Sequence, residues 1–262
     1  MALPTNITVT PNNSPVNQLP RTISASGTNI FERPSYTDRE LFTQTTGDIV
    51  SSDWNGGATP QDGIIGKCLD GNGTDAYIDT SLVRGSSTFM GVSFWYYHEA
   101  GTEGQGLFTL YDSTSTIPIS QASFEIFLSD DGEIWGAASR GGSNNSHVFY
   151  INTTNNQQYA VKDDQWNHIF VWMDTTQSSS PLLRHISVNG GNGSGTSGYY
   201  SGTISSVRAS DRMMIGNHTF YNNRLPIISA LDGKICNLYW STNPDFKNHL
   251  DKYSNIPTVE VN

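Results

Sequence analysis

The sequence has little charge and almost no cysteine. Only 15% of its 262 residues are charged, and the 14 Lys and Arg residues are outnumbered by 24 acidic ones. The resulting net charge of -10 argues against a nucleic-acid-binding protein and against attachment to an anionic membrane. We therefore expect no nucleic-acid partner. Two cysteines, Cys68 and Cys236, are too few for a disulfide framework.

Long apolar runs are also missing. No stretch reaches the length of a membrane span, and Met1–Thr10 has neither the basic nor the apolar part of a signal peptide. We therefore expect that the chain does not insert into a membrane and that it is made in the cytoplasm. Gly, Ser, Thr and Asn are abundant instead, which favours short β-strands joined by polar turns over helices.

Residues 1–62 differ in character from the rest. Proline punctuates them at Pro4, Pro11, Pro15, Pro20 and Pro34. Because proline removes a backbone donor and restricts the preceding residue, this region is predicted to form neither central strands nor a long helix. We expect an extended arm that is anchored on a partner. Within it, Ile7–Thr10 could form an edge strand and Asp38–Phe42 one helical turn.

From Gly63 to about Asn243, short strand-like segments alternate with turn signals. The expected strands are Lys67–Leu69, Ala76–Ile78, Phe89–Tyr97, Leu107–Tyr111, Phe124–Leu128, Ile134–Ala138, His147–Ile151, Gln165–Asp174, His185–Asn189, Met213–Gly216 and Asp232–Trp240. Such a series indicates an antiparallel sandwich. A short helix over Asp245–Tyr253 and a tail over Ile256–Asn262 complete the prediction.

Several short motifs occur in a fixed order along this region. They are the Gly-Lys turn at Gly66 with the Ser-Phe-Trp strand at Ser93, then Trp166–Ile169, Val188–Gly190, Met214–Asn217 and Asp232–Trp240. In this order they resemble the laminin-G-like, concanavalin-A-like jelly-roll family. The resemblance implies an all-β, two-sheet antiparallel jelly-roll sandwich over residues 63–243, between the arm 1–62 and the C-terminal segment 244–262.

The same resemblance bears on the cysteines. In the family, the strands that correspond to those of Cys68 and Cys236 tend to pair in one sheet. The two thiols are therefore expected to be neighbours, reduced and packed as small apolar residues.

An enzyme is not the preferred interpretation. Glycanases with this fold usually carry their carboxylates in an E-x-D-x-x-E pattern on one strand, and no glutamate here belongs to such a pattern. Nucleophile and zinc motifs such as G-x-S-x-G and H-E-x-x-H are also missing. The segment Ser129–Trp135 is better explained as a β-turn packed by a tryptophan. A polysaccharide-degrading hydrolase stays open as an alternative.

Calcium is the one cofactor that the sequence suggests. The loop after the first strand offers hard oxygen ligands at Asp70, Asn72, Asp75 and Asp79. Relatives in the family often carry calcium at an edge of the sandwich. The alternative is that these residues serve turn geometry alone, as Asp and Asn commonly do.

Glycan binding is the best positive hypothesis. With period two along the strands, one face of Val92–His98 holds Trp95 and Tyr97, and a second strand adds His168, Phe170 and Trp172. Aromatic rings on a concave face would form a stacking platform for sugars. The alternative is that the arm or a neighbouring subunit covers them as ordinary packing.

These observations lead to one preferred function. We expect a non-enzymatic virion structural protein, a capsid decoration or tail-appendage subunit, assembled in the host cytoplasm. Residues 1–62 would contact other virion subunits, the jelly roll would face host glycans, and a homo-oligomer would add avidity. A cell-surface adhesion module outside the cell is a further alternative.

Overall fold

The computed structural model describes most of the predicted sandwich. The described residues are 6–10, 22–26, 38–40, 42, 53–64, 66–80, 87–101, 104–112, 122–129, 132–139, 146–150, 160–174, 183–190, 211–217 and 230–249. No helix within these ranges is long and apolar enough to cross a membrane.

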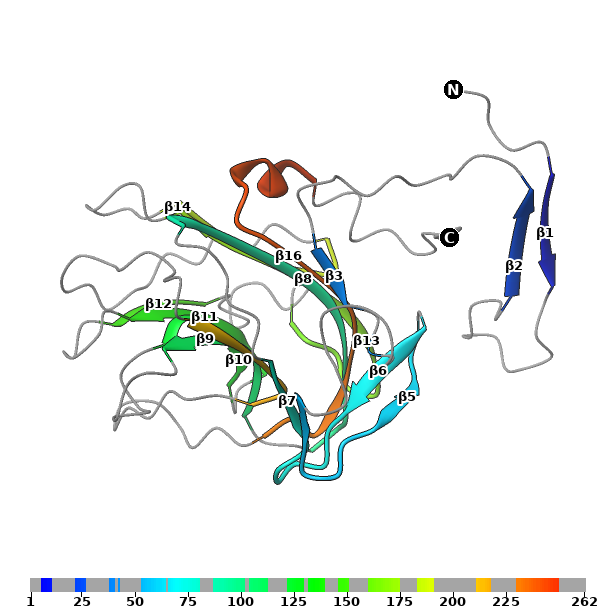
Figure 1. Ribbon diagram of the computed structural model, residues 1–262, viewed down its shortest axis with the longest axis horizontal. Helices are drawn as coiled ribbons and strands as arrows, with labels where there is room; N and C mark the ends of the chain where they lie inside the picture. The colour runs from blue at the N-terminus through cyan, green and yellow to red at the C-terminus, as the bar shows by residue number, and fades with distance from the viewer. Residues whose placement is uncertain are drawn as a thin grey trace.

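Two antiparallel seven-stranded sheets pack face to face (Figure 1). The first, called here the long-strand sheet, has the order β14-β13-β8-β16-β6-β5, with β3 also paired to β16. Its strands are β3 (Asp38–Glu40), β5 (Pro60–Asp62), β6 (Lys67–Asp70), β8 (Phe89–His98), β13 (Gln165–Asp174), β14 (Leu183–Val188) and β16 (Gly233–Ser241). The all-β sandwich is confirmed.

The second sheet has the order β12-β11-β10-β9-β15-β7-β4. Its strands are β4 (Trp54–Asn55), β7 (Tyr77–Thr80), β9 (Gln105–Asp112), β10 (Ala122–Leu128), β11 (Ile134–Ser139), β12 (Ser146–Tyr150) and β15 (Asp211–Ile215). Every strand predicted from Lys67 onward has a counterpart in one of the two sheets, with ends that agree to within two residues, and Gln165–Asp174 coincides with β13.

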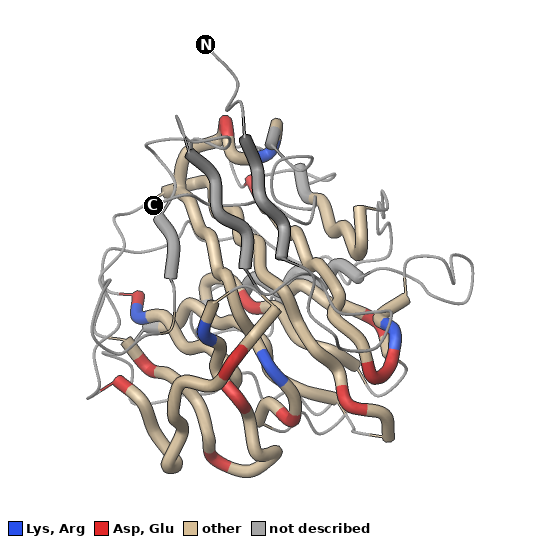
Figure 2. Tube along the Cα trace, turned by 90° about the vertical axis from the view of Figure 1, so that its right-hand side faces the viewer, with Lys and Arg blue, Asp and Glu red and all other residues tan. Residues whose placement is uncertain are grey.

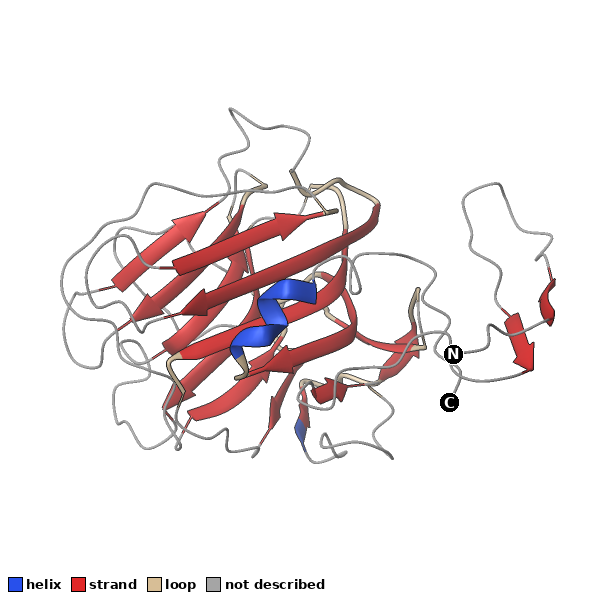
Figure 3. Cartoon of the chain, turned by 90° about the horizontal axis from the view of Figure 1, so that it is seen from above, coloured by secondary structure: helices blue, strands red, loops and turns tan. Residues whose placement is uncertain are grey.

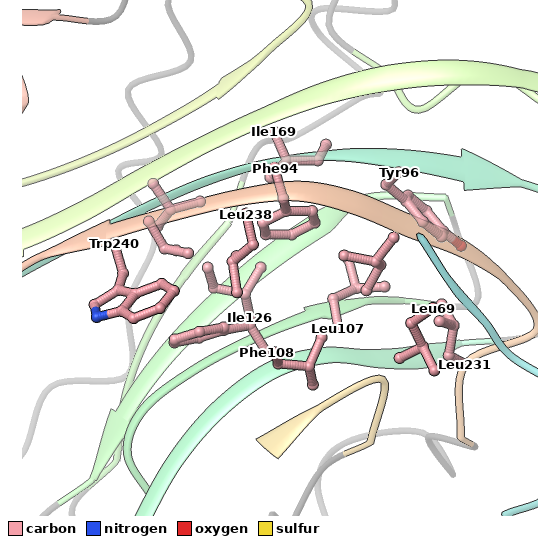
Figure 4. Packing of buried hydrophobic residues seen from close by; sticks show 14 of the residues in the cluster. Leu69, Phe94, Tyr96, Leu107, Phe108, Ile126, Ile169, Leu231, Leu238 and Trp240 are labelled. Carbon is pink, nitrogen blue, oxygen red and sulfur yellow. The ribbon is translucent and has the colours of Figure 1, made fainter. Parts of the chain in front are cut away.

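The core lies between the sheets, and it follows the predicted alternation. Phe94 and Tyr96 of β8 and Ile169 of β13 point inward and are at most 1% exposed. Figure 4 shows them above Phe108 and Ile126 of the second sheet. Because every second side chain of a strand points the same way, the intervening residues of β8 and β13 must lie on the outer face of the long-strand sheet.

The sandwich begins earlier than the predicted boundary at Gly63. Phe42 is fully buried in the core, and its ring meets that of Trp54 edge-on, with 6.5 Å between centroids. β4 and β5 also lie before Gly63. As the prolines predict, neither is a central strand: β4 and β5 lie at the ends of their sheets, and β5 starts at Pro60, where a missing backbone donor is tolerated.

Two further local predictions differ from the structure. Asp38–Glu40 forms strand β3 against β16 instead of a helical turn. The C-terminal helix is a 3-10 helix, η4 (Pro244–His249); the predicted helix end at Tyr253 and the predicted tail Ile256–Asn262 lie outside the described residues. The expected strand near Ile7 is present as β1 (Asn6–Thr10), which pairs with β2 (Thr22–Ser26).

The long strands β8, β13 and β16 curve around the second sheet, so their outer face is convex (Figure 1). η4 lies across this face, as Figure 3 shows from above. Gly91 makes this close approach possible, because a Cβ at that position would lie 2.3 Å from the Phe246 Cδ1 atom. The face predicted to bind sugars is therefore partly covered by the chain itself.

Candidate functional site

The outer face of the long-strand sheet is organised in rows across the strands. Paired residues lie directly opposite each other, so outward side chains of neighbouring strands form continuous lines. We call Trp166, Tyr97, Lys234 and Asp70 the half-exposed row, and His168, Trp95, Cys236 and Cys68 the buried row; each follows the register of β13, β8, β16 and β6. The two rows differ in how far their side chains are exposed to solvent.

The buried row is closed to a ligand. Its side chains are between 0% and 6% exposed, and the His168 and Trp95 rings lie 5.0 Å apart. The loop between β5 and β6 covers the cysteine end, where Ile64 packs against the cluster. Trp95 and His168, two predicted sugar-binding residues, are thus interior residues here.

His168 is held as a neutral imidazole. Its Nε2 lies 2.7 Å from the Ser93 hydroxyl, and complete burial lowers the pKa of His168 to about 3. A hydroxyl and an imidazole at this distance are the first two parts of a nucleophilic site. Both side chains are 1% exposed, so the described surroundings leave no access for a substrate.

Phe170 and Trp172 belong to a second apolar cluster at the other end of the face. Phe170 is fully buried, and the ring of Phe246 from η4 stacks on it at 5.3 Å with an interplanar angle of 5°. Trp172 stays half-buried, but its ring stacks with those of Phe89 and His185. This cluster holds η4 on the sheet.

The half-exposed row is the part of the face that offers chemistry to solvent. Tyr97 and Trp166 are both half-buried, and their rings meet at 65° with centroids 5.6 Å apart. Beside them, Lys234 Nζ lies 3.7 Å from Asp70 Oδ2, with 31% and 36% of the two side chains exposed. Aromatic surface next to a cation and a carboxylate is a combination suited to a ligand that is apolar on one side and polar at its edge.

Of the five predicted sugar-binding residues, Tyr97 alone belongs to this row. Trp166 and Lys234 were missed by sequence reasoning, and Asp70 was assigned to calcium. A pairing register would have identified all three, because Trp166 and Lys234 are the direct neighbours of Tyr97 on either side, and Asp70 is the next neighbour beyond Lys234. The motifs contain each strand but not the alignment between strands.

The structure does not gather the proposed calcium ligands. The Asn72 side-chain oxygen accepts three backbone N–H bonds, from Thr74, Asp75 and Ala76, at 3.0 Å each. Asp79 instead accepts a 2.8 Å hydrogen bond from the Tyr111 hydroxyl. Within the described part of the chain, no group of three or more His, Cys, Asp or Glu could hold a metal ion. The turn-geometry alternative describes what Asn72 does.

The outer face of the second sheet carries another row, formed by Glu125, Thr109, Met214 and Asp79. The Thr109 hydroxyl donates to Glu125 at 3.2 Å, and Arg212 Nε lies 3.2 Å from Asp79. Glu125 and Asp79 stand at opposite ends of the row, so their backbone positions are three strand spacings, or about 14 Å, apart. Glycoside hydrolysis places its carboxylates about 5–10 Å apart. These two do not form such a pair.

Comparison with known proteins adds the fold alone. No family model and no curated protein matches the chain. Among solved structures, the binding domain of botulinum neurotoxin DC in complex with SialylT matches with a TM-score of 0.52 at 9% identity, over 84% of this chain and 51% of that one.

Two further solved structures are more distant in shape. Domain 4 of the arabinanase AbnA from Geobacillus stearothermophilus, in complex with arabinotriose, has a TM-score of 0.41 at 17% identity, over 82% of this chain and 87% of that one. The sialidase module CBM40 of Ruminococcus gnavus, bound to α2,3-sialyllactose, has a TM-score of 0.43 at 9% identity, over 66% and 95%. Together with the sheet order described above, the match to the toxin domain identifies the chain as a jelly-roll sandwich.

Proposed function

We propose that the protein is a non-enzymatic carbohydrate-binding jelly roll, and that the half-exposed row contacts the sugar. The observation that carries this proposal is the line of Trp166, Tyr97, Lys234 and Asp70 across four paired strands. A pyranose ring has an apolar C–H face and a hydroxyl edge. The aromatic pair suits the first, and the charged pair suits the second.

The alternatives to a sugar fit the row less well. A buried protein interface would be more apolar at its centre, with charges at its rim. Here the charged and the aromatic residues are immediate cross-strand neighbours, and all four are partly exposed. The toxin domain of similar fold was solved in complex with SialylT, which supports the idea that a sandwich of this fold can bind a glycan. Because one fold hosts many functions, the row remains the main argument.

The wider role that we propose is that of a virion structural protein, a decoration or tail-appendage subunit. Residues 1–62 would contact neighbouring subunits, and a homo-oligomer would present several weak sugar sites at once. A glycoside hydrolase of the same fold is the second candidate. It is disfavoured by the separation of Glu125 from Asp79 along their row.

Glycan-array binding followed by calorimetric titration tests the sugar site. The variants Tyr97→Ala and Trp166→Ala are expected to weaken binding about tenfold or more each, since every tenfold loss corresponds to ~1.4 kcal/mol. Tyr97→Phe keeps the ring and should bind like the wild type.

Trp172→Ala is the matched control, because Trp172 is a half-buried tryptophan on the same face whose ring is stacked with Phe89 and His185. It should lose stability and keep sugar binding. Thermal melting confirms that each variant is folded. The proposal fails if no glycan binds the wild type, or if binding depends on Trp172 and is indifferent to Tyr97 and Trp166.

A further inference from the structure

The charged half of the row carries information about the kind of sugar. We propose that Lys234 and Asp70 together hold two neighbouring hydroxyls of a neutral sugar unit, and that the site does not select acidic sugars. This inference rests on the proposed function, because it concerns the ligand class of the same row.

The spacing of the two charged groups is the first support. Lys234 Nζ and Asp70 Oδ2 are 3.7 Å apart, which is longer than a hydrogen bond between nitrogen and oxygen. Each group therefore keeps hydrogen-bonding capacity for another molecule. About a third of each side chain is exposed, 31% for Lys234 and 36% for Asp70, so both are accessible from solvent.

The chemistry of the pair is the second support. An ammonium group only donates hydrogen bonds, and a carboxylate only accepts them. A hydroxyl can do either, so one hydroxyl can accept from Lys234 while its neighbour donates to Asp70. Two adjacent hydroxyls match the pair, whereas a carboxylate ligand would gain from Lys234 and be repelled by Asp70.

The local charge balance is the third support. At the β5–β6 edge of the same sheet, Lys67 and Asp62 form another pair at 2.7 Å, with 46% and 93% of the side chains exposed. These two lysines and two aspartates cancel, whereas Asp163, Asp164 and Asp232 add negative charge around His98, the residue after Tyr97 in β8. Figure 2 shows acidic and basic positions interspersed along the described part of the chain on this side of the molecule. An anionic sugar would find no net attraction here.

The order within the row gives the direction of the ligand. Tyr97 lies opposite Lys234, and Lys234 lies opposite Asp70. With about 4.8 Å between strands, Trp166 and Asp70 are about 14 Å apart along the row. That length exceeds a single sugar ring. An oligosaccharide would therefore run across the strands, with its apolar faces on Trp166 and Tyr97 and one diol at Lys234 and Asp70.

The test uses the full chain and an array of neutral glucose, galactose and mannose oligosaccharides, each printed beside its uronic-acid counterpart of the same linkage. The neutral member is expected to bind at least as tightly as its acidic counterpart. For the tightest neutral binder, monodeoxy analogues that lack either hydroxyl of one diol should bind at least tenfold more weakly, because a charged partner is then left without its hydrogen bond.

The variants Asp70→Ala and Lys234→Met complete a cycle with the deoxy analogues. If the pair holds the diol, the penalty for the hydroxyl that faces the altered residue should shrink to less than threefold in that variant. Tyr97→Ala should weaken every ligand alike. Acidic sugars that bind tenfold tighter, or deoxy penalties that persist in both variants, overturn this inference and leave the proposed function standing. An array on which nothing binds overturns the proposed function itself.

Discussion

Cys68 and Cys236 lie directly opposite each other on β6 and β16, and both are fully buried thiols that form no disulfide. The expectation that they are neighbours is confirmed. They lie beneath the loop that joins β5 to β6, where a Cβ added at Gly63 would come within 3.2 Å of the Cys236 Sγ atom. The pair is therefore shielded from solvent, and it brings together two strands that are far apart in sequence.

The first prediction concerns the reactivity of these thiols. Burial raises the pKa of Cys68 to about 12, so the reactive thiolate is rare at neutral pH. We expect neither cysteine to react with iodoacetamide in the folded protein and both to react in denaturant, as counted by mass spectrometry. Ile64→Gly removes a covering side chain and should speed native labelling. Rapid labelling of the wild type in buffer would contradict the burial of the pair.

The fold could be predicted from the sequence because strand alternation is a local property. Ile169, Val171 and Met173 share one face by their spacing alone, and all three are core residues. The turn at Ser129 was likewise recognisable, and its backbone N–H donates to the Glu133 carbonyl oxygen at 2.9 Å. Such features need no knowledge of distant parts of the chain.

The make-up of the half-exposed row could not be predicted, because it depends on relations between distant segments. Phe170 was predicted to contact sugars, but the ring of Phe246 from η4 stacks on it. Alternation also breaks at Asn237, which adopts a positive φ of 53° within a register shift between Cys236 and Tyr239. Beyond this bulge Leu238 rather than Asn237 points into the core. No local sequence pattern predicts this change in the inward and outward alternation of side chains along β16.

Asn72 should be a structural cap of its turn. Its side-chain oxygen accepts three backbone N–H groups, and its amide donates to Asp75 at 2.9 Å. Asn72→Ala is expected to lower the free energy of unfolding by about 1–2 kcal/mol, a typical cost for losing a capping side chain. Urea denaturation measures the change. A variant as stable as the wild type would show that the exposed turn closes without this cap.

Calcium provides a separate check on the same loop. Because the Asn72 oxygen is already used by the backbone, and Asp79 by Tyr111, we expect calcium to leave the melting temperature unchanged. Ligand binding to the folded state alone would raise it in a concentration-dependent way. Differential scanning calorimetry in EDTA and in millimolar calcium separates the outcomes. A rise that Asp75→Asn abolishes would restore the calcium site.

His168 should make the protein less stable in mild acid. Burial lowers the pKa of His168 from 6.5 to about 3, so below pH 6.5 the unfolded chain takes up a proton that the folded chain does not. The free energy of unfolding should therefore fall by about 1.4 kcal/mol per pH unit as the pH drops from about 6 towards 3. Above pH 6.5 this residue should contribute no slope.

His168→Gln isolates this contribution, because Gln offers a polar group near Ser93 and does not titrate. Burial also lowers the pKa values of His98 and His185, so some acid sensitivity should remain in the variant. The slope difference between wild type and variant, from urea denaturation between pH 4 and 8, measures His168 alone. Equal slopes would mean that His168 is protonated in the folded protein.

Gly91 should be required for η4 to pack on the sheet. A Cβ there would lie 2.3 Å from Cδ1 and 2.8 Å from Cε1 of Phe246, a ring that is itself fully buried against Phe170. Gly91→Ala is expected to cost about 1–3 kcal/mol by overpacking, and Phe246→Ala about 3–5 kcal/mol by leaving a cavity. Since truncation of Phe246 removes the clash, the double variant should be little less stable than Phe246→Ala alone. Additive losses in the double-mutant cycle would show that Gly91 matters for the strand itself and that η4 does not depend on it.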